Sequence, residues 1–258
     1  MQTALALILA VVLGWLTGMV VNYVADVLPL RRRLSRPFCP ACDAQIPWLA
    51  YFLLPRRCPT CGQPRPWRTW LVASFYTIAT AALWFSPPTR LGFWVAWLLL
   101  AYFGVVVVID VEYRLILHSV SLAGAALGTA LGVGLHGVQS TLFGGLAGFA
   151  MMAVLYLAGA VMLRWLTRWR QVPPGEVALG FGDVTLGGVI GLVLGWPLIN
   201  LGLMLAVLLG GVVSLLYLIL MMLARRYRLF TALPYGPFLV AGAAAVLFFG
   251  NLLRAWLN

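Results

Sequence analysis

The chain has 258 residues, of which 63% are hydrophobic and only 9% are charged, and its mean hydropathy is +1.00. These values lie far outside the range of soluble globular domains, so the composition excludes a soluble enzyme and indicates a polytopic membrane protein. The formal net charge is +11, and all 17 basic residues are arginines.

Eight apolar stretches are long enough to cross a bilayer as helices, because about 17 to 25 residues span the hydrocarbon layer. They cover residues 4–28, 70–86, 91–110, 118–135, 140–163, 183–197, 199–224 and 234–256, of which the second and the sixth are short. Backbone groups in hydrocarbon must be satisfied within the segment, so the sequence predicts an all-α protein with about eight transmembrane helices. The first stretch lacks a basic start and is too long for a cleavable signal, so we expect it to stay attached.

The arginines sort by membrane face if the spans alternate in direction. Fifteen share one face: Arg31, Arg32, Arg33, Arg36, Arg56, Arg57, Arg65, Arg68, Arg114, Arg164, Arg168, Arg170, Arg225, Arg226 and Arg228. Only Arg90 and Arg254 fall on the other face. The positive-inside rule then makes the first face cytoplasmic and places both chain ends outside. This topology explains the basic charge without nucleic-acid binding, and contact with anionic lipid headgroups is its expected secondary role.

Residues 30–69 form a polar loop, rich in proline and arginine, between the first two spans. This loop carries all four cysteines, as Cys39-Pro-Ala-Cys42 and Cys58-Pro-Thr-Cys61, with 15 residues between the pairs. Two such pairs can supply four thiolates to a tetrahedral Zn²⁺, and a reducing cytoplasm disfavours disulfides. The alternatives are a redox dithiol and a knuckle pair whose metal was lost. Four thiolates close the coordination sphere, so we expect a structural zinc that allows this short loop to fold.

The chain therefore divides into a first transmembrane helix (1–29), a cytoplasmic tetracysteine zinc-binding loop (30–69) and a transmembrane domain (70–258). Small-residue ladders in the fourth and fifth spans predict close helix packing in the last of these. The ladders consist of Gly124, Gly128 and Gly132, and of Gly144 and Gly148. This packing would bring Asp110 towards Asp183.

Only six acids occur, and two of them stand apart from the others. For Asp26 and Asp43 we expect solvated or capping roles, and for Glu112 and Glu176 surface pairing with nearby arginines. The remaining two, Asp110 and Asp183, each lie at a junction between a span and a cytoplasmic loop. The chain crosses the membrane twice between them, so both return to the same face at similar depth.

Two carboxylates that meet in a low-dielectric site share one proton, because both cannot ionise together. One can then act as general base on a water while the protonated one polarises a scissile carbonyl. The glycines Gly180 and Gly182 before Asp183 allow close backbone approach. The same acids also suit proton or ion translocation, and a helix cap alone would explain Asp183.

The ordered motifs resemble a known family, the bacterial prepilin leader peptidases, which are membrane aspartic proteases with a Gly-x-Gly-Asp motif. The resemblance covers most of the chain. It is carried by Gly18 to Asn22 followed by Leu28-Pro29, the four cysteines, Ile109-Asp110, Gly180-Phe181-Gly182-Asp183, and Pro234-Tyr235-Gly236-Pro237-Phe238.

The resemblance implies an aspartic endopeptidase of the bacterial inner membrane, with residues 70–258 as its peptidase domain. Members cleave the basic leader of type IV prepilins or pseudopilins at the cytoplasmic face, and many then methylate the new N-terminus with S-adenosylmethionine. It assigns catalysis to Asp110 and Asp183, zinc binding to Cys39, Cys42, Cys58 and Cys61, and site shaping or substrate contact to Gly180, Gly182, Pro234 and Gly236.

Four residues depart from the family pattern. The chain has Leu117-His118 where Pro-Asp is usual, Thr185 in place of a lysine, and Ser74 in place of a glutamate. Loss of the lysine removes a cation near the acids. We expect these changes to bear on substrate preference, pH dependence and methyl transfer. Two other classes stay open: a proton-coupled transporter, and a non-catalytic zinc-loop assembly protein of a pilus or secretion system.

Overall fold

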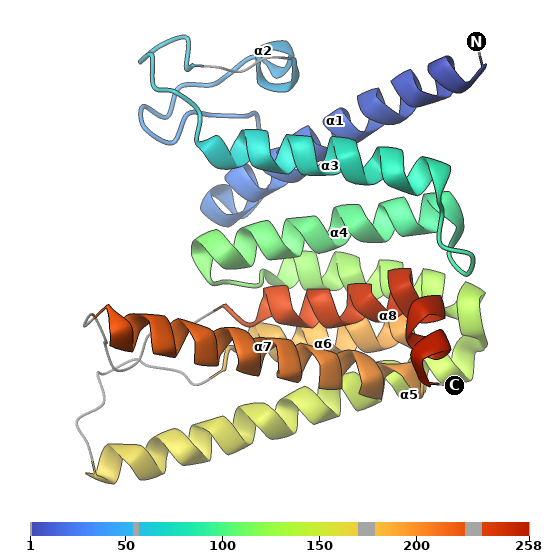
Figure 1. Cartoon of the computed structure of the whole chain (residues 1–258). Helices are drawn as coiled ribbons and strands as arrows, with labels where there is room; N and C mark the ends of the chain where they lie inside the picture. Colours follow the sequence, from blue (N-terminus) through green and yellow to red (C-terminus); the bar gives the residue numbers. More distant parts are fainter. Residues whose placement is uncertain (1, 54–56, 170–178, 225–233, 258) are drawn as a thin grey trace. The chain divides into compact units, whose positions relative to one another are not determined.

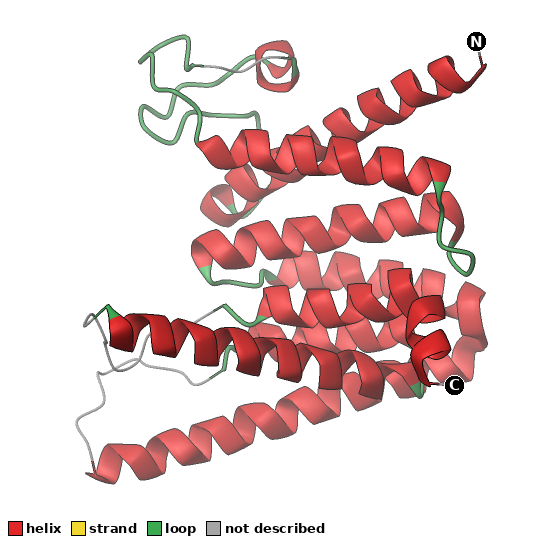
Figure 2. Cartoon of the chain, viewed as in Figure 1, coloured by secondary structure: helices red, strands yellow, loops and turns green. Residues whose placement is uncertain are grey.

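A computed structural model describes the chain except for residues 1, 54–56, 170–178, 225–233 and 258. The described residues form helices joined by loops (Figure 2), which confirms the all-α prediction. In chain order the helices are α1 (Gln2–Arg31), α2 (Trp48–Phe52), α3 (Trp67–Phe85), α4 (Gly92–Tyr113), α5 (His118–Trp169), α6 (Phe181–Leu194), α7 (Leu198–Leu223) and α8 (Gly236–Leu257) (Figure 1).

Four of these helices, α1, α4, α5 and α7, are long and apolar enough to cross a membrane, and α6 and α8 contain shorter apolar helices. The protein is therefore a membrane protein. Each predicted span is helical, but 118–135 and 140–163 are the two halves of α5, which changes direction at Gly137 (φ 82°). A positive φ is readily adopted by glycine, so the chain can reverse there without a separate loop. The number of spans stays a prediction.

The helices group into two compact units, unit 1 (Met1–Ile109) and unit 2 (Asp110–Asn258), and the boundary falls within α4. The division at residues 29 and 69 follows composition and stays a prediction. Of the six acids, Asp110 and Asp183 both belong to unit 2, whereas the cysteine loop belongs to unit 1.

In unit 1, α1 packs closely against α3. A Cβ atom on Gly18 would lie 2.7 Å from the Cα of Ala73, so only glycine permits this approach. Asn22 fixes the same contact, because its amide donates to the carbonyl of Gly18 (2.9 Å) and to that of Thr69 (3.1 Å). The motif from Gly18 to Asn22 is thus a helix-packing motif in this structure.

The cysteine loop contains two knuckles of the same design. In the first, the N–H of Cys39 donates to Ala44 and that of Asp43 to Cys39; in the second, Cys58 donates to Gln63 and Gly62 to Cys58. The residue after the second cysteine of each pair is left-handed, with φ of 58° at Asp43 and 70° at Gly62. A helix begins at the same distance after each knuckle, at Trp48 and at Trp67. The loop is therefore built from two similar halves.

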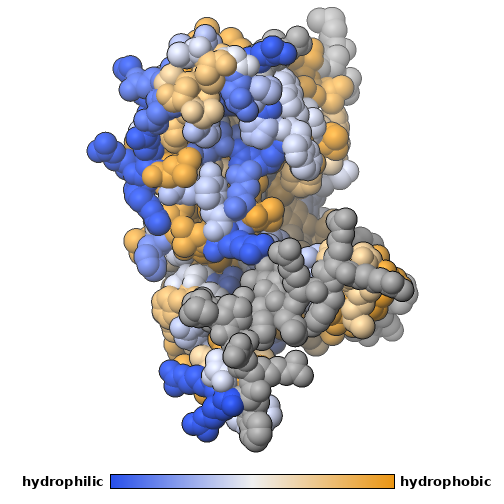
Figure 3. All heavy atoms as spheres, turned by 90° about the vertical axis from the view of Figure 1, so that its left-hand side faces the viewer, coloured by the Kyte–Doolittle hydropathy of each residue, from blue (hydrophilic) through white to orange (hydrophobic). Residues whose placement is uncertain are grey.

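Arginines cover the surface of unit 1 beside this loop. Arg31 ends α1 and Arg32, Arg33 and Arg36 follow it; all four are exposed, and Arg31 pairs with Asp43. Figure 3 shows hydrophilic side chains gathered over the part of unit 1 that carries the loop. This surface is polar enough to lie in water.

In unit 2, α6 packs against both halves of α5. A Cβ atom on Gly132 in the first half would lie 2.2 Å from the carbonyl oxygen of Leu192. A Cβ atom on Gly144 in the second half would lie 2.4 Å from that of Gly191. Such contacts confirm the predicted close packing of the glycine ladders. Ser140 and Trp196 exchange hydrogen bonds of 2.9 and 2.7 Å, which tie the turn of α5 to the end of α6.

Candidate active site

Asp110 and Asp183 are the two buried acids among the described residues, with 5% and 8% of their surfaces exposed. Asp110 lies in the last turn of α4 and Asp183 in the first turn of α6. Their carboxylates are close enough to interact electrostatically. The structure thus brings together the two acids that the sequence singled out, although 72 intervening residues separate them.

The carboxylate of Asp110 is held by the start of α8. The backbone N–H of Gly236 donates to its Oδ2 atom at 2.9 Å, and a Cβ atom on residue 236 would lie 2.6 Å from that oxygen. A glycine is therefore needed at this position. Tyr235, the preceding residue, is half-buried and interacts electrostatically with Asp183. Pro234 is half-buried before it.

Asp183 is held by its own helix start. The N–H of Gly180 donates to the Oδ2 atom of Asp183 at 3.2 Å, so the carboxylate caps α6 as well as facing Asp110. Gly182 allows α6 to approach the connection between α4 and α5, because a Cβ atom there would lie 2.8 Å from the Cβ of Ile116. The motif glycines therefore shape the site through backbone donors and close contacts.

Arg114 lies beside the two acids. The sequence had assigned this arginine only to membrane topology. It follows α4 in a left-handed conformation (φ 51°), and its N–H donates to the carbonyl of Asp110 at 2.8 Å. Its guanidinium is close enough to act on the Asp110 carboxylate electrostatically. Its position four residues after Asp110 was the one signal available.

Thr185 occupies the position at which the resemblance leads one to expect a lysine. Its hydroxyl donates to the carbonyl of Gly182 at 2.8 Å and lies 3.1 Å from the hydroxyl of Ser121 on α5. The residue therefore fastens α6 to α5 and contributes no charge. In this chain Arg114 supplies a cation beside the acids.

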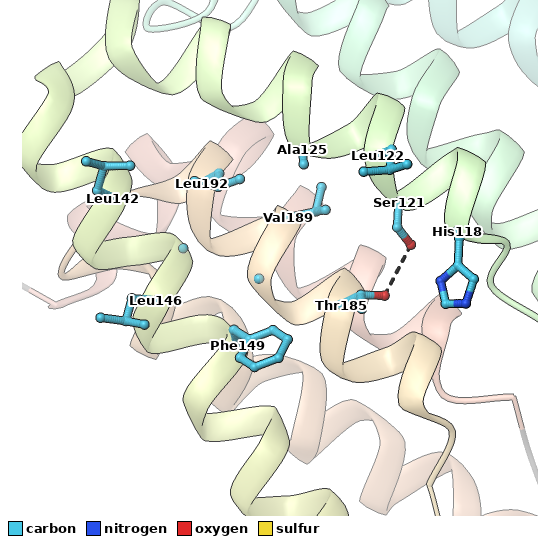
Figure 4. Close-up of a pocket in the computed structure, with 12 residues that line it drawn as sticks. His118, Ser121, Leu122, Ala125, Leu142, Leu146, Phe149, Thr185, Val189 and Leu192 are labelled. Atoms are coloured by element: carbon cyan, nitrogen blue, oxygen red, sulfur yellow. Dashed lines mark hydrogen bonds between the residues drawn. The ribbon is translucent and has the colours of Figure 1, made fainter.

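An apolar groove of about 620 Å³ lies between the two halves of α5 and α6 (Figure 4). Leu122, Leu142, Leu146, Phe149, Val189 and Leu192 are among its lining side chains. One end is polar, where the hydroxyls of Ser121 and Thr185 meet and the exposed His118 stands nearby. Asp183 precedes Thr185 by two residues in the first turns of α6, and neither acid is among the residues that line the groove.

The four cysteines of unit 1 converge. Their sulfur atoms all lie within 4.8 Å of one another, and two pairs, Cys39 with Cys61 and Cys42 with Cys58, are separated by 3.7 Å. Tetrahedral zinc with Zn–S bonds of ~2.3 Å has S–S edges of about 3.8 Å. Backbone N–H groups of Cys61 and Thr60 lower the pKa of Cys58 to about 6, which favours a thiolate at neutral pH. The four cysteines are free thiols, and their arrangement is compatible with a zinc site.

Asp26 has a structural role that the sequence did not predict. Its carboxylate accepts a hydrogen bond of 2.6 Å from the hydroxyl of Tyr51 and pairs with Arg68. The side chains of Asp26 and Arg68 are 21% and 12% exposed, so the expected solvated or capping role is wrong. For Asp43, whose side chain is 70% exposed, the solvated role is confirmed. Glu176 lies outside the described residues.

Two family models match the chain. That of the type IV leader peptidase family matches residues 93–219, and that of the bacterial peptidase A24 N-terminal domain matches residues 12–86. The chain belongs to the type IV leader peptidase family. The first model includes both buried acids and the second all four cysteines, and membership makes the chain a peptidase. The transporter and the non-catalytic assembly protein are accordingly not favoured.

Several relatives are named prepilin leader peptidase/N-methyltransferase. One from Legionella pneumophila is 29% identical over 242 residues, which cover 90% of this chain and 78% of the relative. One from Burkholderia pseudomallei (strain 1026b) is 28% identical over 97% of this chain and 86% of its own length. One from Pseudomonas putida is 29% identical over 96% of this chain and 92% of its own length. No solved structure gives a significant match.

Proposed function

We propose that this peptidase cleaves the basic leader of type IV prepilins or pseudopilins and then methylates the new N-terminus. The proposed place of cleavage is the cytoplasmic face of the inner membrane. The observation that supports catalysis most directly is the burial and electrostatic contact of Asp110 and Asp183. The names of the relatives support the substrate and the methyl transfer.

In the proposed mechanism the two carboxylates share one proton. The ionised one removes a proton from a water as this water attacks the scissile carbonyl, and the protonated one donates to the carbonyl oxygen. The peptide nitrogen then leaves with a proton from the dyad. The N–H groups of Gly236 and Gly180 each engage one oxygen of a carboxylate and hold it in orientation. Preorganised acids of this kind avoid a rearrangement cost during the reaction.

The groove over α6 supports a substrate with an apolar helix. A prepilin is itself a membrane helix with its leader inside the cell, so its cleavage point lies at the membrane interface. A helix seated in the 620 Å³ groove would end beside Thr185, which lies two residues after Asp183 on α6. The apolar lining suits the helix, whereas the polar end suits the peptide that is cut.

For unit 1 we infer a structural zinc ion held by Cys39, Cys42, Cys58 and Cys61. The 3.7 Å sulfur separations support this ion, and four thiolates leave no position for a catalytic water. S-adenosylmethionine would supply the methyl group when bound. The 15 to 2 distribution of the arginines supports a cytoplasmic position of the loop.

The test is leader processing of a co-expressed prepilin by Asp110→Asn and Asp183→Asn variants, followed by gel electrophoresis. We expect either substitution to abolish processing. Asp43→Asn is the matched control, since this exposed acid in the loop should be dispensable. Processing that persists in both catalytic variants would refute the dyad. Mass spectrometry of the mature pilin N-terminus tests methylation separately.

A further inference from the structure

Unit 1 contains a second cavity that the peptidase mechanism does not use. It has a volume of about 470 Å³ and lies among both cysteine knuckles and the end of α1. Its lining includes the side chains of Asp26, Phe38, Ile46, Arg57, Pro64 and Arg65. The cavity thus joins an apolar wall to charged groups in a unit whose surface is polar.

Arg65 is the most unusual residue of this cavity. Its guanidinium stacks on the ring of Tyr51, 3.5 Å from the ring centroid, and burial lowers its pKa. The Nη1 atom is buried and has no hydrogen-bond partner among the described residues. A buried donor without a partner costs free energy, which a bound acceptor would recover.

The repeat within the loop makes Arg65 more informative. Each knuckle places one residue in the cavity seven positions after its first cysteine, and these residues are Ile46 and Arg65. Ile46 is apolar, as expected for a residue that packs inside a small loop. The second is a cation at the equivalent position, so packing alone does not explain it.

The other charged groups that line the cavity do not provide a free hydrogen-bond acceptor for Arg65. Asp26 is the acid in the lining, but its two oxygens already bind Arg68 and Tyr51. Arg57 is exposed and can be solvated. The Nη1 donor of Arg65 thus has no acceptor within the described part of the chain, and a guanidinium fork binds a carboxylate best.

We propose that this cavity binds S-adenosylmethionine and that Arg65 binds its carboxylate, an inference that rests on the proposed methyl transfer. Phe38, Ile46 and the prolines offer an apolar wall to the adenine ring. Cys39 and Cys58 also line the cavity, and a zinc ion with four thiolates has a formal charge of −2, which attracts the cationic sulfonium and ammonium groups. The groove of unit 2 offers such a polar, charged cofactor an almost wholly apolar lining.

The test is equilibrium binding of S-adenosylmethionine to the full-length protein in nanodiscs of zwitterionic lipid. We expect Arg65→Ala to weaken binding at least tenfold, and Arg65→Lys, which keeps the charge but loses the fork, to weaken it less. Arg36→Ala is the matched control, because this exposed arginine of the same loop does not line the cavity. Zinc content is measured in each variant, and unchanged zinc shows that the loop is still folded.

The outcomes separate this inference from the proposed function. If the wild type methylates pilin but Arg65→Ala binds the methyl donor with unchanged affinity, the site is refuted and methyl transfer stands. If Arg65→Ala loses binding while the wild type leaves pilin unmethylated, the site stands and methyl transfer fails. A repeat in anionic nanodiscs tests lipid phosphate as the ligand. Competition by anionic lipid that Arg65→Ala removes would assign Arg65 to headgroups and overturn the proposal.

Discussion

The backbone N–H of Gly236 donates a 2.9 Å hydrogen bond to the carboxylate of Asp110, although the two residues are 126 positions apart. The bond is buried, so it is little weakened by water. It orients one of the two acids of the site from the start of α8. Through this hydrogen bond α8, the last helix, forms part of the site.

We predict that Gly236→Ala strongly impairs peptidase activity. The new Cβ atom would lie 2.6 Å from Oδ2 of Asp110, so the carboxylate or the backbone must move. A loss of about 100-fold in kcat/KM is expected, comparable to the effect of removing one preorganised hydrogen bond at an active site. Cleavage of purified prepilin in detergent measures this effect.

Gly211→Ala on α7 is the control for this substitution. A Cβ atom on Gly211 meets nothing within 4 Å, so the same chemical change should leave kcat/KM unaltered. Wild-type activity in Gly236→Ala would show that the contact with Asp110 has no catalytic importance.

A second prediction concerns the charge of Arg114. We expect Arg114→Gln to lower kcat/KM about threefold to tenfold, because its guanidinium acts on the Asp110 carboxylate from an exposed position, where solvent screens it. Arg114→Lys should retain most activity. The exposed Arg168 in the same unit provides the control, Arg168→Gln. Equal losses in Arg114→Gln and Arg114→Lys would assign Arg114 a role other than charge.

The apolar pattern of the sequence predicted the helices well, because hydrocarbon leaves the backbone few alternatives. It also separated 118–135 from 140–163, which lie on either side of Gly137, but it did not predict that the change of direction would occur at this one glycine, since this depends on a single pair of backbone angles. The two buried acids were found because ionisable groups are rare in such a chain and their topological positions agree.

Other contacts could not be derived from the sequence. The family resemblance assigned Gly180 and Gly236 to the site, but the hydrogen bonds that they donate come from backbone N–H groups, which every residue type except proline carries. The two partners of Asp26 are distant in the sequence: Tyr51 is 25 positions away and Arg68 is 42 positions away. No local periodicity connects the three residues. Its burial depends on the folded loop, so only the structure could show it.

A third prediction concerns the cysteine loop. The purified protein should contain about one zinc per chain, and Cys61→Ser should reduce that content and lower the thermal unfolding temperature. The reason is that binding of a structural zinc contributes about 10 kcal/mol or more to folding of a small domain. Thr60→Ala, within the same knuckle, is the control and should keep its metal. A metal-free protein with an unchanged unfolding temperature would contradict a structural zinc ion.

The last prediction concerns the groove in unit 2. Ala125 lines the groove, so the indole of Ala125→Trp should fill it. Because the substrate helix could then no longer bind there, we expect KM for prepilin to rise about tenfold, with a smaller change in kcat. Ala150→Trp is the matched control, since Ala150 also lies on α5 but lines a separate apolar cleft against α7. A soluble leader peptide without the apolar helix should be cleaved equally by both variants. An unchanged KM for full prepilin in Ala125→Trp would place the substrate helix elsewhere.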